Sequence, residues 1–518
     1  MDQTQAPLVD ALAKAEAHPV IGFGAPGHGR GAAMPRGLRA LVGAKAFKAD
    51  LLTVKGVEDR TEGDLALNRA HEIAAAAWGA DLCRFVTGGS TQSLHTALAA
   101  VARAGDTVLL PTNSHKAEWS YALVAGLDAV PLAVDVDPDW DIQTVVTPAT
   151  LAATLDAHPH AKAAIVVSPN YYGIACDIER LAEVAHARGV PLIVDAAWGG
   201  AFAFSPRLPS DALALGADIQ VCSLHKTMGS LAQGSVLLAR GDLVDQQRLA
   251  LAYELFETTS PSVPILGSLD ATRRDHATGG AKLWGDVLDL AEQARAEIAA
   301  IPGLRVYGQD RVEPRTELDR TKVLIDLSAL GVAGYAADDW LYKHHRIATG
   351  LSEARNLLVV ISLGTGRSDV RTLVKALSDL SDRLRADPAI LPPAPALPGI
   401  ATLGFERAMP GADAYFGQVE EVAYEACTGR IAAEVIAPSP PGVPRLVPGQ
   451  RIDAAHVAWL VANRDAGMFV LDPTDPSEHR LRVVAEAPAI DRPAMFAAEQ
   501  RERQIGSDSS DTIAPSTA

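Results

Sequence analysis

The 518-residue chain is predicted to be an α/β protein built on a parallel β-sheet, and three observations predict this class. Between Asp81 and Arg240, short β-branched runs alternate with helical stretches that begin after capping residues or glycine-containing turns. The runs are almost wholly apolar, which is typical of strands buried on both faces. Each run also leads into a polar or glycine-containing motif, at the edge where ligands of parallel sheets bind.

The expected elements follow one another along the chain as strands joined by crossover helices. Each strand is a short run rich in valine, isoleucine and leucine, as in VPLIVD, and the helices follow glycine-rich or capping turns. The expected strands lie at 83–89, 106–112, 163–170, 190–198 and 218–225, with helices at 90–105 and 176–189.

Changes in composition divide the rest of the chain. A long helical pattern and the strand-like runs TKVLIDLSAL and LLVVISLGTG predict a small α+β unit, and RADPAILPPAPALPG is a stiff, proline-rich linker. The final residues are too polar to fold alone. The predicted parts are an amino-terminal segment (1–45), a large cofactor-binding domain (46–280), the small α+β domain (281–384), the linker (385–399), a carboxy-terminal domain (400–500) and a disordered tail (501–518).

Composition limits the possible functions. The net charge of −17, from 46 basic and 63 acidic residues, argues against nucleic acid as a partner and suits a small cationic substrate. We find no signal peptide and no run long enough to span a bilayer, so no membrane partner is expected. The four widely spaced cysteines suggest neither a disulfide framework nor a metal site, so a cytoplasmic location is expected; they are Cys83, Cys176, Cys222 and Cys427.

The turn VTGGSTQ predicts an anion site. Gly88 and Gly89 leave a strand, and Ser90, Thr91 and Gln92 open a helix. Unpaired amides at a helix start, with hydroxyl groups beside them, suit a phosphate. Ordinary N-capping by one of the hydroxyls is the alternative.

A carboxylate and a lysine follow at the ends of two later strands. Asp195 ends VPLIVD, and a buried carboxylate there needs a cationic partner unless it serves only as a cap. Ser223, His225 and Lys226 end the strand DIQVCS, where a solvated lysine is the alternative. Phosphate turn, aspartate and lysine in this order are what pyridoxal 5′-phosphate (PLP) requires: an anion cradle, a partner for the ring nitrogen and an amine for a Schiff base.

Several further motifs make the sequence resemble the bacterial ornithine/lysine/arginine decarboxylases of the PLP-dependent aspartate-aminotransferase fold. The motifs are APGHGRG, FKADLLTVKGVEDR, NSHKAEWSYALVAG, SPNYYG, VDAAWGGAF, SLHKTMGSLAQGS, TTSPSVPILGSLDATRR and GRIAAEVIAPSPPGVPRLVPGQRI. The last of these is similar to the family's carboxy-terminal domain signature. The resemblance implies a short form without the amino-terminal wing domain of the larger members.

The resemblance also implies roles for individual residues. Lys226 would hold PLP as an internal aldimine, Asp195 would keep the ring nitrogen protonated and His115 would stack on the ring. Decarboxylation through a quinonoid intermediate would end with reprotonation of the α-carbon by His225 or Lys226. The expected cofactor contacts are Gly89, Ser90, Thr91, Gln92, His115, Asp195, Ala197, Ser223, His225, Lys226, Thr259 and Ser260.

Of these contacts, Thr259 and Ser260 belong to the TTSPS segment, which the resemblance places in the site of a neighbouring subunit. A homodimer or higher homo-oligomer is therefore expected. Departures from the family pattern lie at Gly29, where lysine is usual, and at Ala196, which replaces a common glutamate. Thr349 and Gly350 also stand where relatives tend to carry an acidic residue.

The substrate and the outcome of the reaction stay open at this level. The first hypothesis is decarboxylation of a basic amino acid, namely arginine, lysine or ornithine. A second is another carbanion reaction of PLP, such as oxidative deamination or elimination, because a fold does not fix the chemistry. A third is a PLP-binding regulator without turnover. Candidates for binding a distal cation of the substrate are Glu257, Asp338, Asp339 and Glu353.

Overall fold

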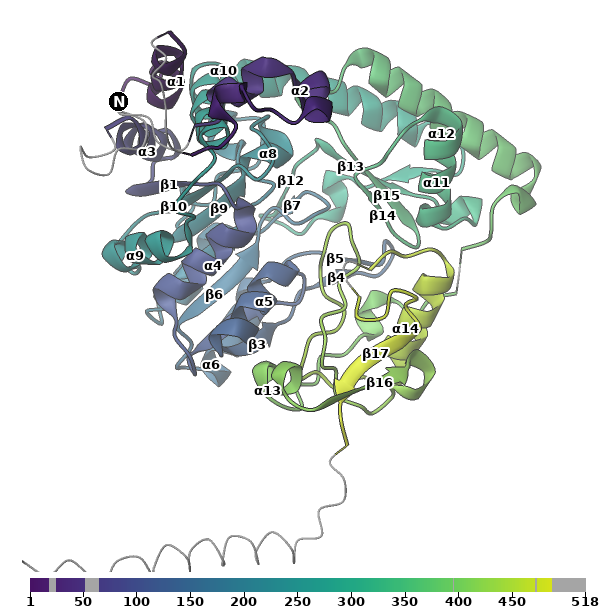
Figure 1. Ribbon diagram of the computed structural model, residues 1–518. Coiled ribbons are helices and arrows are strands. Elements are labelled where there is room, and N and C mark those ends of the chain that lie inside the picture. Colours follow the sequence, from purple (N-terminus) through teal and green to yellow (C-terminus); the bar gives the residue numbers. More distant parts are fainter. Residues whose placement is uncertain (18–24, 52–64, 395, 471–472, 487–518) are drawn as a thin grey trace, which may run out of the picture.

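A computed structural model describes residues 1–17, 25–51, 65–394, 396–470 and 473–486 (Figure 1). Most of the motif FKADLLTVKGVEDR and the predicted tail lie outside these residues. Within the described residues, no helix is long and apolar enough to cross a membrane. The same residues contain no group of three or more histidine, cysteine or acidic side chains placed to hold a metal ion.

A seven-stranded sheet forms the centre of the molecule. Its strand order is β1 (Leu82–Val86), β10 (Ser235–Ala239), β9 (Ile219–Ser223), β8 (Leu192–Asp195), β6 (Ala163–Val167), β2 (Thr107–Pro111) and β3 (Asp128–Leu132). The run from β9 to β3 is parallel, as predicted. β10, which is not among the predicted strands, is antiparallel to both neighbours. The reason is the connection after β9, which holds only the one-turn helix α8 (Leu224–Thr227) and is too short for a crossover.

Helices cover both faces of this sheet. Side chains alternate between the two faces along each strand, so one strand contributes to a hydrophobic core on each face. Val108 and Leu110 of β2 belong to a core shared with α4, α5 and α9, whereas Leu109 belongs to the core shared with α1, α3, α7 and α10. The helices are α1 (Pro7–Ala17), α2 (Arg36–Ala49), α3 (Leu65–Trp78), α4 (Gly89–Val101), α5 (Lys116–Ala125), α6 (Pro148–Ala157), α7 (Ile178–His186), α9 (Gln246–Phe256) and α10 (Val263–Ala299).

A second, four-stranded antiparallel sheet packs beside α10 and forms the predicted small α+β unit (Figure 1). Its order is β11 (Arg305–Val306), β13 (Lys322–Asp326), β15 (Asn356–Val360) and β14 (Leu351–Ser352), with α11 (Gly334–His345) and α12 (Arg367–Ala386). β12 (Glu317–Leu318) pairs with β7 (Ile174–Ala175) of the large domain. The predicted limit at 280/281 falls within the continuous helix α10, and the domain limits stay a prediction.

The C-terminal unit, residues 400–486, has a core of its own. It contains α13 (Gly411–Phe416), β16 (Val419–Ala423), α14 (Ala454–Asp465) and β17 (Arg480–Val484). Tyr424, Ile436, Leu446, Trp459 and Val483 are among its buried residues. Figure 1 shows this unit below the small sheet, close to the hairpin of β4 (Val136–Asp137) and β5 (Ile142–Gln143).

Candidate active site

A cavity of about 260 Å³ lies at the carboxyl ends of β6, β8 and β9, where ligands of parallel sheets bind. It brings together nine of the twelve residues predicted to contact a cofactor. These are Gly89, Ser90, Thr91, His115, Asp195, Ala197, Ser223, His225 and Lys226.

One end of the cavity is formed by the first turn of α4. Gly89 has a φ of +75° and its amide donates to the carbonyl of Gln233 at 2.9 Å. The hydroxyls of Ser90 and Ser223 lie 2.5 Å apart, and Ser235 is 3.3 Å from Ser90. Helix amides and clustered hydroxyl donors at one helix start can bind a phosphate group.

A buried carboxylate also lines the cavity. Asp195 is the last residue of β8, and its Oδ1 accepts from the Ala197 amide at 3.0 Å. Burial raises the pKa of Asp195, and the Lys226 cation and the Ala197 amide oppose this effect. The carboxylate is therefore held at a site where a cationic ring nitrogen would be its natural partner.

Lys226 extends from α8 over the indole ring of Trp198. Its Nζ lies 5.0 Å from the ring centroid, and Nζ of Lys322 lies 5.2 Å from it. Burial lowers the pKa of Lys226, the carboxyl groups of Asp195 and Glu118 oppose this, and Lys322 lowers it further. A lysine with a lowered pKa is more readily deprotonated and therefore better suited to act as a nucleophile.

Two histidines flank Lys226. His225 Nδ1 lies 3.0 Å from the Gly234 carbonyl; because a carbonyl only accepts, Nδ1 is the protonated nitrogen and Nε2 is left as an acceptor. His115 caps α5, accepting from the Ala117 amide at Nδ1 over 3.1 Å. Burial, helped by Lys226 and Lys116, lowers the pKa of His115 to about 4, so its ring is neutral at pH 7.

The C-terminal unit contacts His115 directly, which the sequence did not predict. Gly442 accepts at its carbonyl from the Lys116 amide at 2.9 Å. Its φ is +85°, and a Cβ at this position would lie 2.9 Å from His115 Nε2. Only glycine can therefore occupy this position without displacing the ring.

Three predicted contacts do not line the cavity. The Gln92 amide donates instead to Glu257 Oε2 at 3.1 Å. Thr259 and Ser260 are exposed on the single chain, outside the cavity, and their predicted role in a neighbouring subunit's site stays a prediction.

The predicted contacts do not include Tyr171 and Trp198, among other residues that line the cavity, or Glu118 beside Asp195. Tyr171 and Trp198 line the cavity, and Glu118 is fully buried beside Asp195. All three stand inside motifs quoted above, but only their burial at this edge of the sheet singles them out. Tyr171 and Trp198 follow strand ends, which is the one signal that could have found them.

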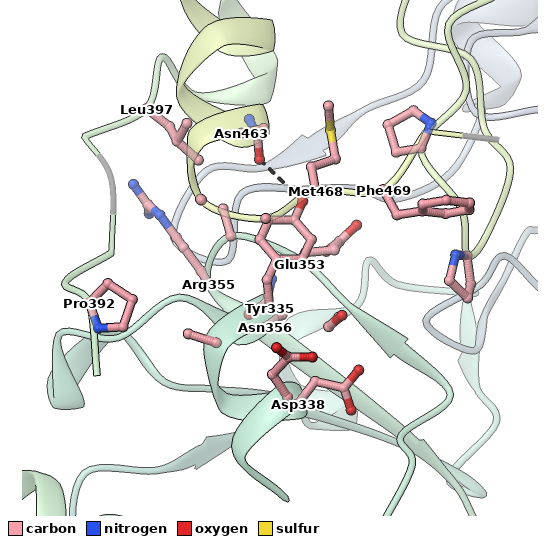
Figure 2. Close-up of a pocket in the computed structure, with 18 of the residues that line it drawn as sticks. Tyr335, Asp338, Glu353, Arg355, Asn356, Pro392, Leu397, Asn463, Met468 and Phe469 are labelled. Atoms are coloured by element: carbon pink, nitrogen blue, oxygen red, sulfur yellow. Dashed lines mark hydrogen bonds between the residues drawn. The ribbon is translucent and has the colours of Figure 1, made fainter. Parts of the chain in front are cut away.

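A larger cavity of about 810 Å³ lies next to this one, between the small unit and the C-terminal unit (Figure 2). Figure 2 shows Asp338 and Glu353 on the side of the small unit and Asn463, Met468 and Phe469 on the other. Glu353 accepts from the Tyr172 hydroxyl at 2.7 Å, and Tyr172 adjoins Tyr171 of the smaller cavity. These three residues, here called the wall, connect the linings of the two cavities.

Thr349 and Gly350, two of the departures from the family pattern, lie beside β14 of the small sheet. Gly350 precedes β14, and a Cβ there would meet the Leu358 carbonyl at 3.3 Å, so a larger side chain would be crowded. Thr349 donates its amide and hydroxyl to Asp338. Ala196 is buried next to Asp195, and Gly29 lies in a turn with a φ of +52°.

Like Glu353, the other candidates for binding a substrate cation have partners. Glu257 accepts from Thr87 and Gln92 near the start of α4, and Asp339 forms an exposed ion pair with Lys343. Asp338 accepts from Thr349. Glu353 is the candidate that lies in the wall beside the smaller cavity.

The fold and this cavity define the class of protein: the chain has the fold of the aminotransferases, and Lys226, Asp195 and the start of α4 meet at the end of its parallel strands. The chain belongs to the ornithine/lysine/arginine decarboxylase family. Residues 6–316 match the family model described as Orn/Lys/Arg decarboxylase, major domain, and residues 405–468 match Orn/Lys/Arg decarboxylase, C-terminal domain. The predicted family is confirmed.

Individual relatives agree with this assignment. The chain is 36% identical to arginine decarboxylase of Halalkalibacterium halodurans over 491 residues, covering 94% of this chain and 99% of the relative. It is 32% identical to arginine decarboxylase of Bacillus subtilis over 501 residues, covering 95% and 100%. The crystal structure of lysine decarboxylase LdcF from Francisella novicida superimposes with a TM-score of 0.80 at 20% identity, covering 93% of this chain and 81% of that one. The predicted fold class and the prediction of a decarboxylase are thereby confirmed.

Proposed function

We propose that this chain is an arginine decarboxylase that uses PLP bound in the smaller cavity. The observation that carries the proposal is the meeting of Lys226, Asp195 and His115 in one cavity of the large domain. Similarity to arginine decarboxylases over nearly the whole chain favours arginine over lysine and ornithine.

The residues present fit PLP. The start of α4 with Ser90 and Ser223 would hold the phosphate, and the His115 ring would cover the pyridine ring. Asp195 would accept from the ring nitrogen, and Lys226 would supply the amine. The Trp198 indole N–H is buried and has no hydrogen-bond partner among the described residues, as expected of a wall that faces a ligand.

When bound, PLP supplies the electron sink that accepts the electron pair left as carbon dioxide departs. The chain's own residues orient the substrate and move protons. Lys226, with its lowered pKa, can hold or release a proton at Nζ, whereas neutral His225 can accept a proton at Nε2. Both residues are on α8 and line the cavity.

Glu353 is our candidate for binding the guanidinium group of arginine. It lies in the wall between the two cavities, and a carboxylate suits the planar donor pattern of a guanidinium. Burial raises the pKa of Glu353 in the free protein, and the Tyr172 hydroxyl and Arg445 oppose this. An arriving cation would favour its charged form further.

Two further expectations, a homodimer and a cytoplasmic location, stay proposals. The exposure of Thr259 and Ser260, together with that of Leu251 and Leu255 on the adjoining α9, supports a homodimer whose subunits complete one another's sites. A cytoplasmic location is supported by the four cysteines, all of which are free thiols.

The test is a product assay on purified protein supplied with PLP. Arginine, lysine and ornithine are offered separately, and carbon dioxide, amine, ammonia and hydrogen peroxide are measured. We expect carbon dioxide and the corresponding amine, fastest from arginine, no turnover or visible cofactor band in Lys226→Ala, and wild-type rates in the exposed-lysine control Lys282→Ala.

Other results would select the alternatives. Peroxide or ammonia without carbon dioxide would indicate oxidative deamination or elimination, and PLP binding without any product would indicate a regulator. Faster release of carbon dioxide from lysine or ornithine would refute arginine as the substrate.

A further inference from the structure

Glu118 is a buried carboxyl group that the reaction outlined above does not use. It is the third residue of α5, one turn after His115, and its side chain is fully buried. A glutamate at this helix position usually reaches back to the cap residue, but neither carboxyl oxygen of Glu118 has a hydrogen-bond donor among the described residues. A buried polar group without a partner needs an explanation.

The neighbour of Glu118 is the carboxyl group of Asp195. The two groups are close enough to change each other's pKa, α5 bringing one and β8 the other, and both also interact with Lys226 and Tyr171. Two oxygen atoms of carboxyl groups can form a hydrogen bond only if one of the groups carries a proton.

The charges around the pair show which group holds that proton. Lys226 is the cation that balances Asp195, and the other buried lysine nearby, Lys322, is paired with Asp319. A second carboxylate would have no cation of its own, at a place where burial is costly for an unpaired charge.

The local hydrogen bonds assign the proton to Glu118. Asp195 accepts from the Ala197 amide, which favours its charged form, whereas neither Glu118 oxygen meets a donor from another residue, and the backbone amide of Glu118 itself only partly opposes the effect of burial. The start of α5 favours an anion, but this effect is small beside the cost of a second buried charge. Burial and the Asp195 charge accordingly raise the pKa of Glu118 well above its usual range.

We propose that Glu118 is a positioning residue that remains a neutral carboxylic acid and donates a hydrogen bond to Asp195, holding that aspartate as a carboxylate facing the ring nitrogen of PLP. One Asp195 oxygen accepts from the Ala197 amide, and the carboxylate also accepts from the acid of Glu118. The Asp195 carboxylate then still has a lone pair that can accept from the ring N–H of PLP. This inference rests on PLP being the cofactor.

The first experiment measures the proton itself in the cofactor-free protein. Infrared difference spectra of wild type against Glu118→Gln should show the loss of a carbonyl stretching band of a protonated acid. Glu434→Gln is the matched control, because Glu434 is a buried carboxylate that accepts three hydrogen bonds, from the Thr474 amide and hydroxyl and from the Arg482 amide. The control should lose no such band. Equal spectra for the two variants would overturn the proposal.

The second experiment measures PLP affinity by quenching of tryptophan fluorescence, since Trp198 lines the cavity. Glu118→Gln retains a neutral donor and should bind PLP within about threefold of wild type, whereas Glu118→Leu should bind roughly tenfold to a hundredfold more weakly. Wild-type affinity in Glu118→Leu would overturn the positioning role. If Glu118→Leu does not fold, the infrared comparison decides alone. Failure of the wild type itself to bind PLP would refute the proposed function instead.

Discussion

Gly442→Ala should weaken cofactor binding although residue 442 belongs to the C-terminal unit. The added Cβ would lie 2.9 Å from His115 Nε2 and 3.2 Å from its Cδ2. Carbon atoms pack comfortably at about 3.5 to 4.0 Å, so the ring or the loop must retreat by roughly half an ångström. Because His115 also caps α5, the displacement should disturb both its cap and its stacking on PLP.

The expected size follows from the stacking that is lost. Stacked ring pairs contribute about 0.5 to 1.5 kcal/mol, so PLP should bind roughly threefold to tenfold more weakly. The alanine must also adopt a φ of +85°, which costs about 1 to 2 kcal/mol of unfolding free energy. Fluorescence titration with PLP measures the first effect, and urea unfolding measures the second.

Gly429→Ala is the matched control. Gly429 belongs to the same unit and has a φ of +84°, but a Cβ there would meet no atom within 4 Å. The two variants should therefore lose similar stability, and Gly442→Ala alone should lose PLP affinity. Equal PLP affinities in the two variants would refute the contact between loop and ring as the cause.

Three further predictions concern the substrate, the core and the dimer. Glu353→Gln should raise KM for arginine about tenfold without changing PLP affinity, by loss of one charged hydrogen bond; steady-state kinetics and PLP titration check this. Burial lowers the pKa of His71 from 6.5 to about 3, and its Nε2 accepts from the Phe85 amide. As the pH falls, the unfolded chain therefore binds a proton at His71 before the folded chain does. The free energy of unfolding should fall accordingly between pH 6.5 and pH 3. His71→Gln should flatten that part of a urea-unfolding series, and an unchanged slope would contradict the assignment. Co-expressing Lys226→Ala with Ser260→Ala chains should give hybrid dimers with one intact site. The test requires that Ser260→Ala is itself folded and impaired. Activity of the mixture no higher than the average of the two parents would then show that each site is built within one chain.

Local signals in the sequence predicted the parts of the site that depend on local structure. Two glycines before a helix placed the turn at Gly89, and a polar residue after an apolar run placed Asp195 and Lys226 at strand ends. Each of these features is determined by a few neighbouring residues, because strand ends of a parallel sheet meet at one edge. Local signals therefore account for the nine predicted residues that line one cavity, and their roles toward a cofactor stay a prediction.

The missed features depend on contacts between distant segments. Glu118 has the position of an ordinary helix-start acid, and its burial against Asp195 requires α5 and β8 to be packed together. Gln92 has the spacing of a cofactor contact, but its amide turns to Glu257 of α9's C-terminal end. The sequence pattern does not show whether the Gln92 amide bonds a cofactor or Glu257, because either one would satisfy this side chain.

The contact between Gly442 and His115 also explains why a C-terminal unit with its own core can matter for chemistry in the large domain. Pro438, Pro440 and Pro441 have a restricted φ, so the segment before Gly442 loses little conformational entropy when it is ordered. The glycine then supplies the positive φ that brings the backbone onto the imidazole, and its carbonyl fixes the first turn of α5 through Lys116. The same turn carries His115, which is proposed to stack on the PLP ring, and Glu118, which is proposed to donate to Asp195. Movement of this loop would therefore reach both groups at once, through one helix start, without any change in the sheet that holds Lys226.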